Sequence, residues 1–226
     1  MPGAGRLPPE ALRRALQRDQ RPVQPLLRPT ARLLIVLLVA SGAAAFLISL
    51  AGLRPDRAML DSQLLWIPAA VRLLAGLFLI LLALREGVPG SGAPGVTGYG
   101  SLLGVPILLA LLTEWVGWRT GGATLPGLAT QATGALGCYP REVLLAIPAL
   151  LVFAWLLARA YPLRPVFAAT AGAAGVGLLA DAVLHLICPV TILSHTLLVH
   201  GGAVVTLAAV AACVGWIAAR RRFAAT

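Results

Sequence analysis

The chain has no lysine and few charged side chains of any kind. Charged residues make up 12% of its 226 residues, and only eight residues are acidic. Hydrophobic residues make up 59% of the sequence, and its mean hydropathy is +0.88. Because soluble globular domains carry about 25% charged residues, this composition excludes a soluble domain.

The sequence also lacks the motifs of common catalytic sites. It has no phosphate-binding loop, no HExxH pair and no Ser/His/Asp arrangement with a plausible nucleophile turn. The glycine-rich stretch GYGSLLG at 98–104 follows no predicted strand, and the few scattered acids do not favour a transporter. We therefore expect a protein that is not an enzyme, with no catalytic residue, no cofactor and no small-molecule substrate.

Six long apolar stretches fill most of residues 33–218. Each has 18 to 24 residues, and at about 1.5 Å of rise per residue such a helix spans about 27–36 Å, the thickness of a bilayer core. The predicted fold is therefore an all-α membrane protein, a bundle of six transmembrane helices. The stretches are Leu33–Leu53, Leu64–Leu84, Ser101–Trp118, Val143–Ala160, Val166–Ile187 and His195–Ala218.

The arginines between these stretches fall mainly on one side. If the N-terminus is inside, thirteen arginines lie inside, four lie outside and Arg72 lies within a span. This bias predicts that both termini are cytoplasmic. It also explains the net charge of +10 without nucleic acid, because arginines that flank spans meet anionic headgroups. The inside set is Arg6, Arg13, Arg14, Arg18, Arg21, Arg28, Arg32, Arg85, Arg159, Arg164, Arg220, Arg221 and Arg222, and the outside set is Arg54, Arg57, Arg119 and Arg141.

Residues 1–32 form a polar segment before the first span, and residues 219–226 form a basic tail. In the N-terminal segment, Leu12, Ala15 and Leu16 recur at helical spacing among arginines. A helix of about ten residues is marginal alone and needs a partner. The segment is interpreted either as a basic anchor on the headgroups or as a peptide that docks on a cytoplasmic protein.

Two of the three cysteines are predicted to lie at the outer rim of the bundle. Cys138 precedes the fourth span and Cys188 closes the fifth. Two thiols at one depth can form a disulfide, sense oxidants or bind a soft metal, or they are two unrelated small residues. Cys213, in the middle of the sixth span, is interpreted as a small buried hydrophobic residue.

Four polar residues gather at the same predicted depth as these thiols. Asp181 and His185 are four residues apart and share a helix face, while His195 and His200 begin the sixth span. Zinc-like metals use such ligands, but the spacings match no recognised metal motif, so no metal site is assigned. The simpler expectation is a hydrogen-bonded Asp–His pair that orients two helices.

Two further charges are predicted inside spans. Arg72 in the second span and Glu114 in the third can pair within the bundle, or else extend to the interfaces.

The order of several segments along nearly the whole chain resembles the NrsF-type anti-sigma factors, six-span inner-membrane proteins of Gram-negative bacteria. No single piece is a strict motif, and Val199 stands before His200 where an aromatic residue is expected. The matching segments are LRRALQRDQRPVQPLLRP, GLRPDRAMLDSQLLW, LREGVPG, the cysteine followed by IPALL, ARAYPLRPVFAATAGAAGVGLLA, LHLICPV and LVHGGAVVTLAAV with GWIAARR near the end.

The resemblance implies regulation by sequestration. Such a protein holds a sigma factor of the extracytoplasmic-function (ECF) class at the bacterial inner membrane through its cytoplasmic N-terminal segment. A periplasmic signal, redox or metal, perceived through Cys138 and Cys188 then releases it. The residues expected to bind the sigma factor are Leu12, Arg13, Leu16, Arg21 and Val23, with Asp181, His185, His195 and His200 as an accessory polar cluster.

A competing hypothesis is a small redox subunit of a membrane enzyme complex. In that case His185 and His200, on adjacent spans at similar depth, would be axial ligands of a haem. Their position near the rim argues against it, because a haem site usually needs facing histidines well inside the bundle.

Overall fold

The computed structural model describes Glu10, Arg14, Gln17 and residues 26–58, 62–87, 96–121, 137–190 and 193–224. Within these residues the chain is helical and contains no strand. The elements are α2 (Pro29–Ala51), η1 (Pro55–Ala58), α3 (Ser62–Arg85), α4 (Val96–Gly121), α6 (Cys138–Ala160), α7 (Pro165–Ile187), α8 (Leu193–His195), η3 (Thr196–His200) and α9 (Gly201–Ala224).

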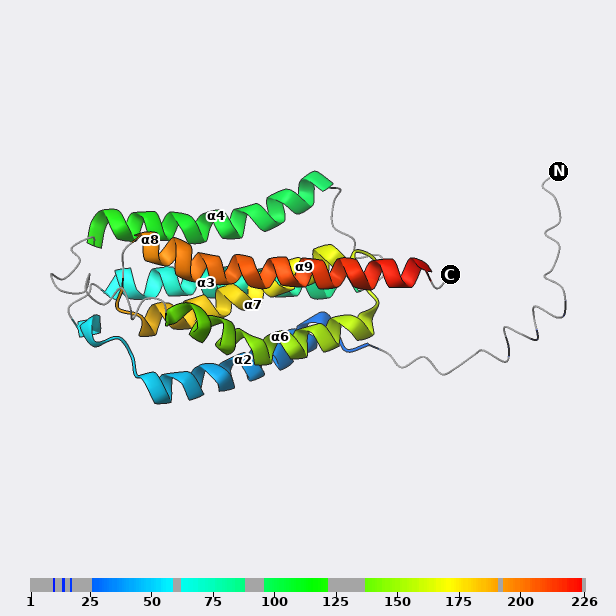
Figure 1. Ribbon diagram of the computed structural model, residues 1–226, viewed down its shortest axis with the longest axis horizontal. Helices are drawn as coiled ribbons and strands as arrows, with labels where there is room; N and C mark the ends of the chain where they lie inside the picture. Colours follow the sequence, from blue (N-terminus) through cyan, green and yellow to red (C-terminus); the bar gives the residue numbers. More distant parts are fainter. Residues whose placement is uncertain are drawn as a thin grey trace.

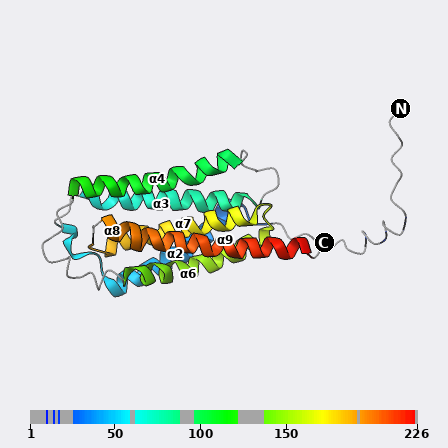
Figure 2. The same ribbon diagram turned by 45° about the horizontal axis from the view of Figure 1, so that its top comes forward.

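The long helices form one elongated antiparallel bundle (Figure 1). Helix α7 is at its centre and packs against α3, α9, α6 and α2. Helix α4 lies along α3 at one edge, and α2 packs beside α6 at the opposite edge, as both views show (Figures 1 and 2). Helix α2 begins and α9 ends at the same end of the bundle, while α6 begins and α7 ends at the other (Figure 1).

Five helices are long and apolar enough to cross a membrane, namely Pro29–Ala51, Leu65–Arg85, Cys138–Ala160, Pro165–Ile187 and Thr196–Arg221. The remaining predicted span lies in α4, where the apolar part found among the described residues, Gly104–Thr113, is shorter. Only 6% of the most apolar stretch of α2 is buried by the protein, and Leu38 is 75% exposed. Large apolar side chains exposed in this number require an apolar surrounding, which indicates a membrane protein.

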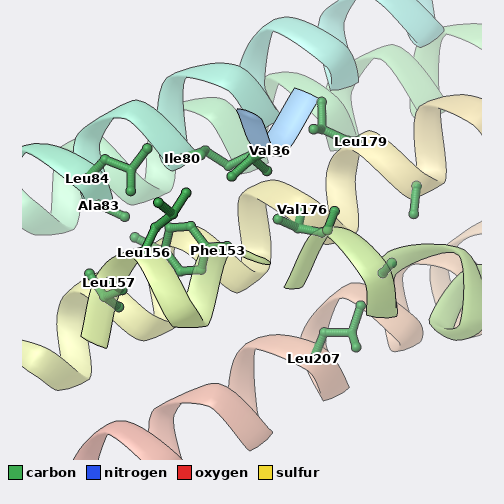
Figure 3. Packing of buried hydrophobic residues seen from close by; sticks show 14 of the residues in the cluster. Val36, Ile80, Ala83, Leu84, Phe153, Leu156, Leu157, Val176, Leu179 and Leu207 are labelled. Carbon is green, nitrogen blue, oxygen red and sulfur yellow. The ribbon is translucent and has the colours of Figure 1, made fainter. Parts of the chain in front are cut away.

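Small residues let the central helix approach its neighbours closely. A Cβ added at Gly175 would lie 2.7 Å from the carbonyl oxygen of Gly76 on α3, and one at Gly172 would lie 1.8 Å from Phe153 Cζ on α6. The glycines of α7 therefore permit direct backbone packing, which is typical of small residues in membrane bundles. Around these contacts, a buried cluster joins five helices through side chains such as Val36, Ile80, Phe153, Val176 and Leu207 (Figure 3).

Helices α2, α4 and α6 each begin four or five residues before the predicted spans, at Pro29, Val96 and Cys138. Helix α2 begins at Pro29, a residue tolerated in a first turn, so Arg32 lies inside the helix. Arg32 is 1% exposed, and its Nη2 donates to the carbonyl oxygen of Leu84 at 2.9 Å, which joins the start of α2 to the end of α3. Helix α6 begins at Cys138 and not at Val143, so Cys138 belongs to the helix itself.

Candidate functional site

Two thiols meet at the end of the bundle where α6 begins and α7 ends. Cys138 is the first residue of α6, and Cys188 directly follows the last residue of α7. Both side chains are buried and form no disulfide, and Cys138 Sγ donates to Cys188 Sγ at 3.4 Å. The contact with Cys138, and then burial, raise the pKa of the Cys188 thiol above its ordinary value. Both effects favour the neutral thiol over the thiolate at Cys188.

The segment that carries Cys188 is held by the connection between α2 and α3. The backbone N–H of Cys188 donates to Leu184 and ends α7, and the N–H of Arg54 donates to Leu186 at 3.0 Å. Arg54 is 2% exposed, and its guanidinium donates to the carbonyl oxygen of Pro189 at 3.4 Å. Carbonyl groups at a helix end have no partner within the helix, so Arg54 both satisfies this end and fixes its position.

A π-helical turn brings two histidines beside the thiols. The Nε2 atom of His195 lies 3.4 Å from Cys188 Sγ, and the His195 and His200 rings meet edge to face with centroids 5.1 Å apart. In a regular α-helix, residues five apart point about 140° away from each other. Here the N–H of Gly201 bonds to Thr196, five residues back, and this wider turn places both histidines toward one side.

Behind the histidines, two carboxylates and an arginine form a buried ionic group. The Nδ1 atom of His200 lies 2.8 Å from Glu142 Oε2 and 3.3 Å from Asp181 Oδ1. On its other side, Asp181 Oδ2 accepts from Arg72 Nε at 2.8 Å. Glu142 is 0% exposed and Arg72 is 1% exposed, so these charges are compensated by one another and not by water.

The buried charges pair across helices. Arg72 is enclosed in the bundle and bonds Asp181, so it does not extend to the interface; the side chain of Glu114 lies outside the described residues. The expected Asp–His pair that orients two helices is present, because Asp181 Oδ1 on α7 lies 3.3 Å from Nδ1 of His200 on η3. Interhelical partners are favoured here because each buried charge needs an opposite charge nearby.

These residues form two donor groups that share one imidazole. The thiol–histidine group consists of Cys138, Cys188, His195 and His200, and the carboxylate group consists of Glu142, Asp181 and His200; in each, one donor atom per residue lies within 4.8 Å of the others. Every member of both groups is buried. His200 is thus the only residue of these groups that contacts both the sulfur side and the carboxylate side.

The haem hypothesis finds little support in this geometry. The His200 ring is 4% exposed, with Nδ1 against two carboxylates and its edge against His195. An axial haem ligand needs open space for the haem plane beside its ring nitrogen, whereas protein side chains enclose this ring.

A sequence profile of the NrsF family, described as negative regulator of sigma F, matches residues 16–220. The chain belongs to the NrsF family. No curated protein matches the chain, and no solved structure does. The NrsF description is that of a regulator and not of an enzyme, so the chain is a negative regulator of a sigma factor. The match includes both donor groups and begins at Leu16, so Leu12 and Arg13 precede it.

The structure of this NrsF chain brings together most of the predicted polar residues. One donor group contains Cys138, Cys188, His195 and His200, and Asp181 belongs to the other, which shares His200. His185 belongs to neither group. Cys213 is exposed on the surface of the bundle, so its interpretation as a buried small residue is wrong. The predicted sigma-factor ligands Leu12, Arg13, Leu16, Arg21 and Val23 lie outside the described residues.

Sequence reasoning missed Glu142, which it left in the loop before the fourth span. The missing signal was the helical spacing of Cys138, Glu142, Leu145, Ala149 and Phe153, all of which are buried on one face of α6. At steps of four, three, four and four residues, Glu142 falls on the face that points into the bundle.

Proposed function

We propose that this NrsF protein is anchored in the bacterial inner membrane and holds an ECF-class sigma factor on its cytoplasmic N-terminal segment. A periplasmic signal received at Cys138 and Cys188 releases the sigma factor. The observation that carries this function is the pair of buried thiols at the end of the bundle opposite the start of α2 (Figure 1).

The proposed orientation is supported by charge and by the helix arrangement. Thirteen inside arginines against four outside favour cytoplasmic termini. That placement needs α2 to begin and α9 to end at one end of the bundle, as in Figure 1. The opposite end, with Cys138 and Cys188, then faces the periplasm, which is oxidising and exposed to metal ions from outside the cell.

The docking role rests on the N-terminal segment. Glu10, Arg14 and Gln17 are helical, and an exposed ion pair joins Arg14 Nη2 to Glu10 Oε2 at 3.2 Å. Leu12 and Leu16 lie outside the described residues, but their spacing in the sequence is that of an apolar stripe, which can bind a groove on a partner. The arginines of the segment would match acidic surface on the sigma factor.

A path for the signal runs through the central helix. Ligation of a metal by the thiols would shift the end of α7, and so would oxidation, in which the two thiols lose two protons and two electrons to an oxidant such as a disulfide. Helix α7 contacts α3 through the backbones of Gly175 and Gly76. The end of α3 in turn accepts the hydrogen bond of Arg32, next to the docking segment. A bias of a few kcal/mol between two packings is enough for release.

Co-purification tests this function directly. The full-length protein, tagged at its C-terminus, is extracted in mild detergent from cells of its own species before and after exposure to oxidant or to a thiophilic metal. We expect an ECF-class sigma factor to co-purify before exposure and to be lost afterwards. Absence of any sigma factor from the unexposed sample would exclude sequestration by this chain.

A further inference from the structure

We propose that Cys138, Cys188, His195 and His200 form a tetrahedral binding site for a borderline-soft divalent cation of the zinc type. The site would make a metal ion the signal that Cys138 and Cys188 receive, and in that respect it rests on the proposed function. Cys138 comes from the start of α6, Cys188 from the end of α7, and the two histidines from α8 and η3. An ion there would join the start of α6 and the end of α7 to the continuous α8–η3 segment.

The donor atoms already have nearly the spacing that such an ion needs. A tetrahedral ion with Zn–S bonds of about 2.3 Å and Zn–N bonds of about 2.0–2.1 Å holds its ligand atoms roughly 3.3–3.8 Å apart. The two Sγ atoms are 3.4 Å apart, and Cys188 Sγ is 3.4 Å from His195 Nε2. All four donors lie within 4.8 Å of one another, so small side-chain shifts complete the geometry.

The donor set selects the metal. Two thiolates and two imidazoles suit Zn²⁺ and similar cations, whereas Mg²⁺ and Ca²⁺ require oxygen ligands. Binding would displace the thiol protons, so two thiolates would neutralise the charge of a divalent ion. The buried site then gains no net charge, which avoids the high cost of an uncompensated charge away from water.

The carboxylate group is placed to orient one ligand. Because Nδ1 of His200 lies 2.8 Å from Glu142 Oε2, Nε2 is the nitrogen left to face the ion. A carboxylate behind a ligating histidine fixes the ring and raises its basicity, and removing it typically weakens metal affinity 10–100-fold. Glu142 and Asp181 are thus positioning residues, and Arg72 balances the charge of Asp181.

The site could not be recognised in the sequence, because the spacing of its cysteines along the chain is not that of a zinc motif. Four residues separate His195 from His200, which is within the three to five typical of paired zinc histidines. Cys138 and Cys188, however, are 50 residues apart and lack the short spacing of a zinc cysteine pair. Only the packing of α6 against α7 brings the two sulfurs together.

X-ray absorption of the wild-type protein is the first test. Full-length protein with a tag free of histidine is purified in detergent under reductant, loaded with one equivalent of Zn²⁺ and freed of unbound ion. We expect one zinc per chain with two sulfur and two nitrogen neighbours. No retained zinc, or a shell of oxygen and nitrogen only, would overturn the site, and this result does not depend on any variant folding.

Variants then assign the ligands. With Co²⁺ as a spectroscopic substitute, we expect Cys188→Ser to lower the sulfur-to-cobalt absorption by about half or more, because only the Cys138 thiolate remains. We expect His195→Ala to weaken binding at least tenfold. His185→Ala and Cys213→Ser, which change the same residue types outside the group, should bind as wild type. Glu142→Gln should weaken binding 10–100-fold while keeping the two-sulfur, two-nitrogen shell. Equal binding by His195→Ala and His185→Ala would exclude the histidine ligands.

The same preparations separate this site from the proposed function. If the wild-type protein co-purifies with a sigma factor but binds no zinc, sequestration stands and the metal site is excluded. If it binds zinc through the expected ligands but co-purifies with no sigma factor, the metal site stands and sequestration is excluded.

Discussion

Arg72 Nε and Asp181 Oδ2 lie 2.8 Å apart in the interior of the bundle and join α3 to α7. Arg72 is 1% exposed and Asp181 is 7% exposed. The two residues contribute to stability only as a pair, because each buried charge is tolerable only while the opposite charge is present.

Replacing one partner of this pair should therefore destabilise the bundle strongly. We expect Arg72→Met to lower the free energy of unfolding by about 3–5 kcal/mol, since it leaves Asp181 buried without its cation. The double variant Arg72→Met/Asp181→Leu should recover much of that loss. Denaturant titration in detergent measures both, with the exposed Arg141→Met as a control that should unfold as wild type. Equal loss in the single and double variants would contradict the pairing.

The close approach of α7 to α3 predicts opposite effects for two glycine substitutions. Gly175→Ala places a Cβ 2.7 Å from a backbone oxygen, and such overpacking costs about 1–3 kcal/mol. Gly42→Ala on α2 meets nothing within 4 Å, so it should stabilise the helix by about 0.5–1 kcal/mol. Thermal unfolding in detergent compares them, and a stabilising Gly175→Ala would show that the two backbones are not in contact.

The docking segment should depend on its apolar stripe. Burying two leucines contributes roughly 3–6 kcal/mol, so Leu12→Asp/Leu16→Asp should abolish sigma-factor retention. Gln17→Asp/Gln20→Asp introduces the same charge at polar positions of the segment and should retain the partner. Co-purification and reporter transcription give the two readouts. Continued repression by the leucine variant would exclude this mode of docking.

The cysteine pair should behave as one unit in signalling. We expect Cys138→Ser or Cys188→Ser to lock the signalling state, with the double variant no worse than either single one, because both residues serve one site. Cys213→Ser should respond as wild type, since Cys213 is exposed on the bundle surface away from the pair. Alkylation mass shifts with and without reductant report the state of the thiols. Normal responses of both single variants to oxidant and thiophilic metal would refute sensing by the pair.

The arginine distribution predicts the position of the C-terminus. A reporter fused after Thr226 should be active only if it is a type that functions in the cytoplasm, because an even number of spans returns the chain to its starting side. Periplasmic phosphatase activity at that position would reject six spans with both termini inside. A fusion within the loop at 122–136 should give the opposite pattern.

Local sequence patterns predicted where the helices lie better than they predicted which buried side chains contact each other. The apolar runs located the helical segments because length and hydropathy are properties of a continuous stretch. The partner of Arg72 could not be found in this way, since Asp181 is 109 residues distant and depends on which helices pack together. The shared direction of His195 and His200 was hidden for a different reason, as it requires a π-helical turn in place of regular helical periodicity.

The central position of α7 has a consequence for how the chain enters a membrane. Of the five helices able to cross one, α7 is the least hydropathic and the most enclosed by protein, and it carries Asp181. A segment rich in alanine and glycine with an internal acid partitions weakly into lipid by itself. Its integration during synthesis should therefore depend on α3, whose Arg72 and Gly76 receive it. In a nascent chain that lacks α3, α7 should therefore fail to integrate into the membrane, and it would remain in the insertion channel or pass into water.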